Sequence, residues 1–192
     1  MFILINIVSK KRFQILEKII EKKEFTQYEI KKELKFGMSI VNDTVQMLIE
    51  KEFIETKNNK YFLKDEKGLL ELIAFLKPTK ILAIIKTSIP KKEAIKRIDA
   101  IICMETALEQ YTNYYKSNRL AIYANKTQLT KIKKQFFVPG NETEIAIFED
   151  EPKLTKKEII SDKIKYTNKI RTIIDLYRDN KAFLADKIRK VN

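Results

Sequence analysis

The first 64 residues combine three helical patterns with a hairpin pattern, and this order constrains the fold more than any other feature. The third pattern, Met38–Glu50, has one apolar face, formed at helical spacing by Val41, Val45, Leu48 and Ile49. We expect the hydroxyl of Ser39 to cap its first turn. The opposite face carries Asn42, Asp43 and Gln46, short polar side chains near its N-terminal end. Taken alone this is an ordinary amphipathic helix, so its neighbours decide its interpretation.

Two shorter helices are predicted before it. The first runs from Ser9, its cap, to about Lys22, with an inner face of Phe13, Leu16, Ile19 and Ile20. The stretch Thr26-Gln-Tyr-Glu29 is a capping box. In this motif the Thr26 side chain accepts a hydrogen bond from the backbone amide of Glu29, and the Glu29 side chain accepts one from the amide of Thr26. The capping box starts a second helix, whose buried side we expect to be Tyr28, Ile30 and Leu34. Gly37 should end that helix, because glycine adopts a left-handed conformation without steric cost.

Two strand patterns follow, residues 53–57 and 60–63, around Asn58-Asn59. Asparagine tolerates the positive φ that tight hairpin turns need. The whole order, Ser9–Lys64, resembles a winged-helix DNA-binding domain. The resemblance implies a recognition helix at Ser39–Glu50 and a wing at Ile54–Leu63. One difference is that many such domains have glycine before the first wing strand, where this chain has residues 51–53, Lys-Glu-Phe.

A recognition helix of this kind would present Asn42, Gln46 and Asp43 to base edges in the major groove. The residues that we expect to contact phosphates are Ser39, Lys35, Lys10, Lys11, Arg12, Lys57 and Lys60. Three of these, residues 10–12, crowd the first turn of a helix, where positive charge opposes the helix dipole but suits a phosphate. A solvated basic face is the alternative for them. Some winged helices bind RNA or proteins instead of DNA, so these alternatives stay open.

The net charge of +13 favours a polyanionic partner, although Lys- and Glu-rich surfaces also simply solvate a protein. The charge is uneven. Residues 1–77 hold 15 basic and 12 acidic side chains, net +3, which leaves +10 for the rest of the chain. Electrostatics alone would therefore point to the second half as the DNA-binding part.

Composition argues against several classes of protein. Cys103 is the only cysteine, which excludes an intrachain disulfide and favours a reducing, cytoplasmic location. The absence of histidine excludes His-based metal sites and catalytic triads. Met1–Val8 is apolar but too short to span a bilayer, and it lacks the features of a secretory signal. The three glycines do not form a phosphate-binding loop. We therefore expect no enzymatic activity, no metal and no cofactor.

The second half alternates strand and helix patterns. A linker helix at Leu69–Leu76 follows Gly68 and ends at Lys77-Pro78, so we divide the chain into residues 1–77 and 78–192. Further strands are predicted at residues 80–85, 120–124 and 144–148. Helices are predicted at residues 91–97, 101–115, 127–136 with a Thr127 cap, 168–177 and 181–191. The fold class is therefore α+β, a winged helix followed by a mixed α/β domain.

Four segments of this half carry a second resemblance: Met104–Leu108, Leu120–Ala124, Arg171–Tyr177 and Ala182–Ile188. Their order and sequence resemble the C-terminal region of AbiEi-type antitoxins, the repressors of abortive-infection modules. The resemblance implies repression of the protein's own operon and antagonism of a nucleotidyltransferase-like toxin, without enzymatic activity. The inferred partners are thus a double-stranded operator, a second copy of the chain and such a toxin, with no membrane.

Other interpretations of the second half stay open. Exposed tyrosines could stack on single-stranded nucleic acid, and the candidates are Tyr111, Tyr114, Tyr115 and Tyr123. A basic patch of Lys131, Lys133 and Lys134, with Lys156, Lys157, Lys163 and Lys165, could extend a DNA footprint. Residues 149–153, Glu-Asp-Glu-Pro-Lys, resemble a nuclease fragment, but we interpret them as a solvated acidic loop. Asp175 and Asp179 are expected to pair with Arg171 or Arg178.

The main hypothesis is a dimeric winged-helix regulator that binds an inverted repeat. One alternative is a nucleic-acid enzyme, or its accessory subunit, with the active part in the second half. The other is an RNA- or protein-binding module in which the winged helix only assembles a complex.

Overall fold

The computed structural model describes residues 9–113, 115–149, 158–161 and 164–189. The chain divides into two compact units, Met1–Pro78 and Thr79–Asn192, one residue beyond the division expected from the sequence. Each unit is described by itself. The interpretations of Met1–Val8, Tyr114, residues 150–153 and three lysines (Lys156, Lys157 and Lys163) concern positions outside the described residues.

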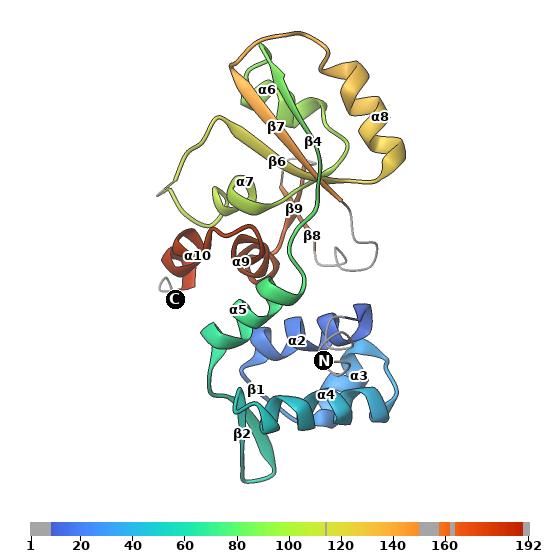
Figure 1. Ribbon diagram of the computed structural model, residues 1–192, viewed down its shortest axis with the longest axis vertical. Helices are drawn as coiled ribbons and strands as arrows, with labels where there is room; N and C mark the ends of the chain where they lie inside the picture. Colours follow the sequence, from blue (N-terminus) through green and yellow to red (C-terminus); the bar gives the residue numbers. More distant parts are fainter. Residues whose placement is uncertain (1–8, 114, 150–157, 162–163, 190–192) are drawn as a thin grey trace. The chain divides into compact units, whose positions relative to one another are not determined.

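The first unit is a winged helix (Figure 1). Its helices are α2 (Lys10–Lys22), α3 (Gln27–Leu34), α4 (Met38–Glu50) and α5 (Glu66–Leu76). Its strands are β1 (Glu24–Phe25), β2 (Ile54–Lys57) and β3 (Lys60–Leu63), in the order β1-β3-β2 with both pairings antiparallel. The strand β1 was not predicted. The fold class expected from the sequence is confirmed.

Side-chain caps start the first two helices as predicted. Ser9 Oγ accepts a hydrogen bond from the amide of Arg12 at 3.4 Å. In the capping box, Thr26 Oγ1 accepts from the Glu29 amide and Glu29 Oε2 accepts from the Thr26 amide, at 3.2 and 2.7 Å. The helices then bury one core, and its fully buried members include Phe13, Leu16, Ile19, Ile20, Ile30, Val41, Val45 and Leu48.

The turn between α3 and α4 differs from the prediction. Lys35, not Gly37, adopts the left-handed conformation, with φ 56° and ψ 40°. Gly37 is extended and precedes α4, which begins at Met38 without a side-chain cap. Ser39 is thus the second helical residue and not the cap. Tyr28 is 63% exposed because it lies two positions from Ile30, on nearly the opposite side of the helix.

The end of α4 explains how the wing starts without glycine. The amides of Glu52 and Phe53 donate to the carbonyls of Ile49 and Leu48, both at 2.9 Å. This pattern, a Schellman motif, needs a left-handed residue, and Glu52 supplies it with φ 60°. The hairpin turn is formed as predicted, with positive φ at Asn58 and Asn59.

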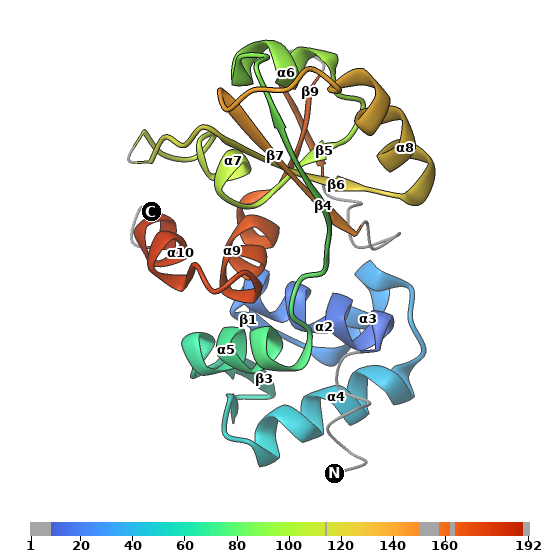
Figure 2. The same cartoon turned by 45° about the horizontal axis from the view of Figure 1, so that its top comes forward.

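The second unit is a mixed sheet with helices on both faces (Figure 2). Its strands are β4 (Ile81–Thr87), β5 (Ile101–Ile102), β6 (Arg119–Ala124), β7 (Thr143–Glu149), β8 (Glu158–Ser161) and β9 (Ile164–Thr167). They lie in the order β4-β7-β6-β5-β9-β8. The pairs β6–β7 and β5–β9 are parallel and the other pairs are antiparallel.

The helices of this unit are α6 (Lys91–Arg97), α7 (Met104–Leu108), α8 (Lys126–Gln135), α9 (Lys169–Arg178) and α10 (Ala182–Arg189). One face of the sheet packs against α6 and α8, through a core that includes Ala94, Ile132 and Phe136. The other face lies against α7 and α9.

Three predictions for the second unit were wrong. Ile101 and Ile102 form a strand that pairs with β6 and β9. The helix expected at residues 101–115 therefore spans only Met104–Leu108. The strand at residues 80–85 was expected to be buried, but β4 lies at the edge of the sheet and is half exposed. Asn125, not Thr127, caps α8, in a second capping box. The strands β8 and β9 were not predicted.

Candidate nucleic-acid interface

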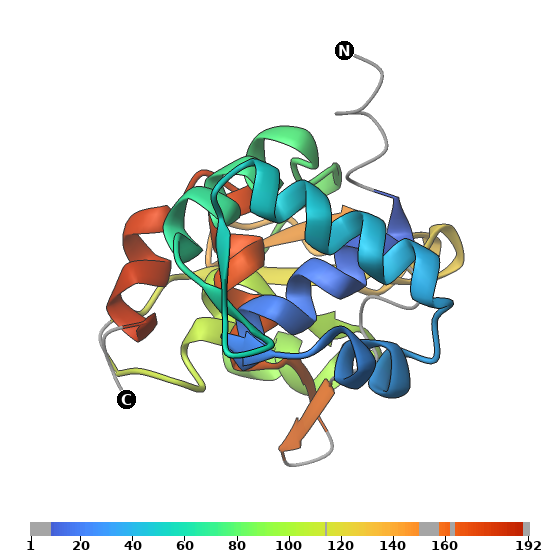
Figure 3. The same cartoon turned by 90° about the horizontal axis from the view of Figure 1, so that it is seen from below.

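The exposed face of α4 carries every residue that we expected to contact bases. Asn42, Asp43 and Gln46 are all exposed, whereas Thr44 is buried and donates to the carbonyl of Ile40 at 2.6 Å. The helix and the hairpin β2–β3 can be followed in Figure 3, in cyan and teal. This face can therefore offer amide and carboxylate groups to a groove without any change in the core.

Gln27, which the sequence did not single out, links three elements behind this face. Its Nε2 donates to Asn42 Oδ1 at 3.2 Å and lies 3.1 Å from the hydroxyl of Tyr61 on the wing. This bond engages Asn42 Oδ1, and Nδ2 remains available as a donor because it makes no hydrogen bond to a described residue. Gln46 makes no side-chain hydrogen bond to any described residue, so both its donor and its acceptor are available. Only the tertiary arrangement reveals the role of Gln27.

The charge on α4 is unusual for a DNA-reading helix. Met38–Glu50 contains no lysine or arginine, and its two charged residues are Asp43 and Glu50. Positive potential must come from its surroundings. The first-turn amides of α4 receive no side-chain cap, and together with the Ser39 hydroxyl they offer donors and a partial positive charge to an anion.

The lysines around α4 differ in whether they form an ion pair with a described residue. Lys35 and Lys57 are exposed and form no ion pair with any described residue. Lys60, at the wing, instead donates to Glu24 Oε1 at 2.6 Å, and this hydrogen bond raises the pKa of Lys60. Its charge is thus partly offset, which weakens it as a phosphate contact.

The basic start of α2 is also accessible. Lys10 and Lys11 are exposed and Arg12 is half-buried. Lys11 Nζ lies 5.9 Å from the centre of the Phe36 ring, a cation–π distance that links this turn to the segment before α4. The predicted phosphate contacts thus occupy α2, the α3–α4 turn and the wing.

In the second unit, Lys131, Lys133 and Lys134 are exposed on α8. Two of the four tyrosines that we considered for stacking are engaged within the fold. Tyr123 is buried and Tyr111 donates to the carbonyl of Thr167 at 2.8 Å. Burial raises the pKa of both phenols, to about 12 for Tyr111.

Charged residues of α9 form a buried cluster. Arg171 Nε donates to both carboxylate oxygens of Asp175, at 2.8 and 2.9 Å, and Arg178 donates to the same group at 3.1 Å. The predicted pairing of Asp175 is therefore confirmed. Asp179 instead accepts from Lys181 at 2.5 Å. Arg171, Asp175 and Arg178 are buried, whereas Asp179 and Lys181 are partly exposed.

No metal centre is visible in the described part of the chain, which contains no group of three or more metal-ligating side chains. Glu149, the first residue of the nuclease-like fragment, pairs with Lys80 at 3.2 Å. Among the described helices, none has the length and apolar character needed to cross a membrane.

An exposed polar helix beside a basic hairpin, on this scaffold, defines the class of winged-helix DNA-binding proteins. The family comparison agrees: the model of the TFIIE alpha subunit matches residues 1–107, more than half of the chain. The chain belongs to the TFIIE alpha subunit family, and its function is DNA binding related to transcription.

The match continues past the winged helix and ends inside α7. It gives no support to the AbiEi-like interpretation of the later residues. No curated protein and no solved structure is significantly similar to the chain.

Proposed function

We propose that the protein is a sequence-specific regulator of transcription that binds duplex DNA through its winged helix. The observation that carries the proposal is the exposed face of α4, where Gln27 holds Asn42 and Gln46 makes no side-chain hydrogen bond to a described residue. The wing beside it carries Lys57, which is exposed and forms no ion pair with a described residue. The amide side chains of Asn42 and Gln46 can both pair with adenine in the major groove, and Asp43 can accept from cytosine.

Affinity and specificity come from different parts of the molecule in this proposal. Because α4 lacks basic residues, phosphate contacts fall to Lys35, Lys57 and the first turn of α2, with Ser39 and the α4 amides at one further phosphate. The more basic second unit adds affinity that does not depend on sequence.

Two substitutions separate these roles in a mobility-shift titration. Lys57→Ala should weaken binding to every duplex and lower the salt slope by about one, whereas Gln46→Ala should cost about 1–3 kcal/mol at one base position. Lys60→Ala is the matched control, and its effect should be smaller because Glu24 already offsets that charge. Unchanged operator binding in both the Lys57 and the Gln46 variants would show that the assignment is wrong.

Dimerisation and repression are the finer parts of the proposal. A dimer would place two copies of α4 on an inverted repeat. Footprinting on the promoter of the protein's own gene tests autorepression, and sedimentation of the complex tests the stoichiometry. The proposal involves no catalysis, so metal-dependent cleavage of DNA by the purified chain, or a preference for RNA, would contradict it.

We also propose an antitoxin role, which rests on the resemblance of the four C-terminal segments to AbiEi-type antitoxins. Glu105 of α7 accepts from Arg119 at 3.2 Å and from Lys181 at 3.0 Å, and α9, with Arg171 and Asp175, packs against α7. The two partners of Glu105 each stand one residue before another segment that carries the resemblance. Rescue of growth when the chain is co-expressed with a nucleotidyltransferase-like toxin encoded by a neighbouring gene tests this role. The absence of such a gene would leave a plain regulator.

A further inference from the structure

The edge of the second unit's sheet has an unusual composition. Among the described strands, β4 pairs only with β7, so one row of its backbone amides and carbonyls has no strand partner. Edge strands usually carry charges or are covered, because an apolar edge pairs readily with another chain. In β4, however, Ile81 and Ile84 are 46% and 52% exposed.

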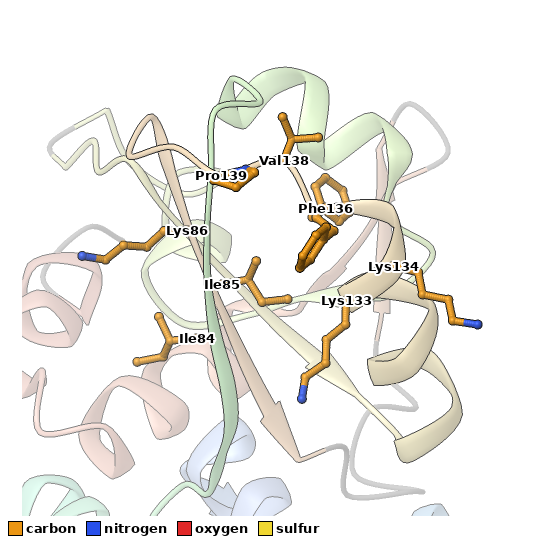
Figure 4. A pocket seen from close by; sticks show the side chains of 9 residues that line it. Ile84, Ile85, Lys86, Lys133, Lys134, Phe136, Val138 and Pro139 are labelled. Atoms are coloured by element: carbon orange, nitrogen blue, oxygen red, sulfur yellow. The ribbon is translucent and has the colours of Figure 1, made fainter.

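A groove of about 680 Å³ runs along this edge (Figure 4). Ile84, Ile85 and Lys86 line it together, although successive side chains of a strand point to opposite faces. The groove therefore follows the backbone edge of β4. Its other wall comes from the end of α8 and the segment after it: Lys133, Lys134, Phe136, Phe137, Val138 and Pro139.

The groove combines apolar walls with charge of one sign. Phe137 is 83% exposed and Val138 46%, so the wall offers large apolar side chains to solvent. The charged lining residues are Lys86, Lys133 and Lys134, and no acidic residue joins them. All three are exposed, and none forms an ion pair with a described residue.

We propose that this β4 edge groove binds an extended, acidic segment of a partner protein, which adds a strand to β4. Backbone hydrogen bonds to the free edge would supply affinity, as in β-strand addition generally. Apolar side chains of the segment would contact Ile84, Ile85 and Phe137, and its carboxylates would pair with the three lysines. The proposal does not depend on the DNA-binding role of the winged helix.

Charge and shape favour this occupant over two others. A second copy of the same edge would bring lysines against lysines, which repel. The phosphates of a nucleic acid would pair with the lysines. A nucleic acid would not, however, bury the aliphatic walls or form strand-like hydrogen bonds with the free amides and carbonyls of β4. An acidic, apolar peptide satisfies all three features.

A peptide titration on the full chain tests the proposal. The probe is a labelled peptide of about eight residues with the repeat Glu-Glu-Val-Val, which places glutamate and valine on both faces of a strand, and its counterpart has the repeat Lys-Lys-Val-Val. Fluorescence anisotropy gives the dissociation constants, and hydrogen exchange reports on residues 81–87. The glutamate peptide should bind and slow exchange in β4, and the lysine peptide should not.

Two double variants assign the binding to the groove. Lys133→Glu with Lys134→Glu should weaken binding of the glutamate peptide about tenfold or more. Lys126→Glu with Lys131→Glu makes the same change in charge on the same helix, away from the groove, and should change binding less than about twofold. Phe137→Ser, at an exposed position that the fold does not need, should also weaken binding.

Several outcomes would overturn the proposal. They are no binding of the glutamate peptide, equal binding of the lysine peptide, equal effects of the two double variants, or unchanged exchange in β4. Single-stranded oligothymidine that binds at the groove would assign it to nucleic acid instead. Self-association of the chain that Phe137→Ser abolishes would assign it to a second copy.

Discussion

Glu52 occupies a backbone conformation that suits glycine better. Its φ of 60° lies in the left-handed region, which costs an L-residue about 1–2 kcal/mol. The conformation persists because two features depend on this turn: the Schellman hydrogen bonds at the end of α4 and the start of the wing. The same feature explains why the absence of glycine here did not change the fold.

Glu52→Gly should therefore stabilise the winged helix. The relief of strain exceeds the extra backbone entropy of glycine, so we expect a gain of about 0.5–1 kcal/mol in the free energy of unfolding. Urea denaturation followed by circular dichroism measures it. Glu50→Gly is the control, because it makes the same change at the last residue of α4, where glycine should lower the stability by up to about 1 kcal/mol. A loss of stability in Glu52→Gly would contradict the argument.

Glu33 links α3 to α2 through two lysines. Its carboxylate oxygens lie 2.8 Å from Lys18 Nζ and 2.8 Å from Lys22 Nζ. The hydrogen bonds from Lys18 and then Lys22 lower the pKa of Glu33 from 4.5 to about 2. A pKa that is lower in the folded state means that the group stabilises the fold above pH 4.5, and that this contribution disappears as the pH falls towards 2.

Glu33→Gln should consequently be less stable than wild type at pH 7, by about 1 kcal/mol or less because the site is partly solvated. The difference should shrink between pH 4.5 and about 2. Urea denaturation of both proteins across this range measures it. A difference that stays constant with pH would show that the ion pairs do not stabilise the fold.

Features that depend on residues close in sequence could be predicted, and features that depend on tertiary packing could not. The caps at Ser9 and Thr26 depend on side chains within one turn of the helix, so the sequence reveals them. The left-handed position at Lys35, and not at Gly37, depends on how α3 and α4 pack. The bond from Gln27 to Asn42 joins residues 15 positions apart in sequence, and no local pattern indicates it.

At the scale of elements, the strands of the second unit were the hardest to predict. Ile101 and Ile102 lie before a helical pattern, and an apolar run of this length fits a helix or a strand equally well. Their partners, Tyr123 and Ile122 on one side and Lys165 and Tyr166 on the other, are distant in sequence. Helices with clear periodicity, such as α9, were found within a residue.

The buried charges of α9 lead to a prediction at this scale. Asp175 is fully buried and accepts hydrogen bonds from both Arg171 and Arg178, so Asp175→Asn should remove a buried negative charge that both arginines contact. We expect a loss of about 3–5 kcal/mol in the stability of the second unit. Chemical denaturation measures it.

Asp186→Asn provides the comparison, because Asp186 makes the same kind of pair with Arg189 but is partly solvated. Its loss should stay below about 1 kcal/mol. Equal losses in the two variants would mean that the burial of the α9 cluster does not determine its contribution.

At the scale of the whole molecule, the excess positive charge and the candidate reading helix lie in different units. The winged helix carries an exposed polar face on α4 with no basic residue, while the second unit carries most of the excess positive charge. Residues 1–77 have a net charge of only +3, so charge alone pointed to the second half, whereas the order of helices and strands pointed to α4. The winged-helix fold and the family match support α4 as the candidate element for sequence specificity.

Selection of binding sites from a random pool of duplexes tests this account most directly. The full chain should enrich one sequence, and the Gln46→Ala variant should lose the preference at one position of each half-site while it keeps the rest. Failure of the wild-type chain to enrich any sequence, or the same enriched sequence from wild type and variant, would contradict the assignment of α4 as the element that determines specificity.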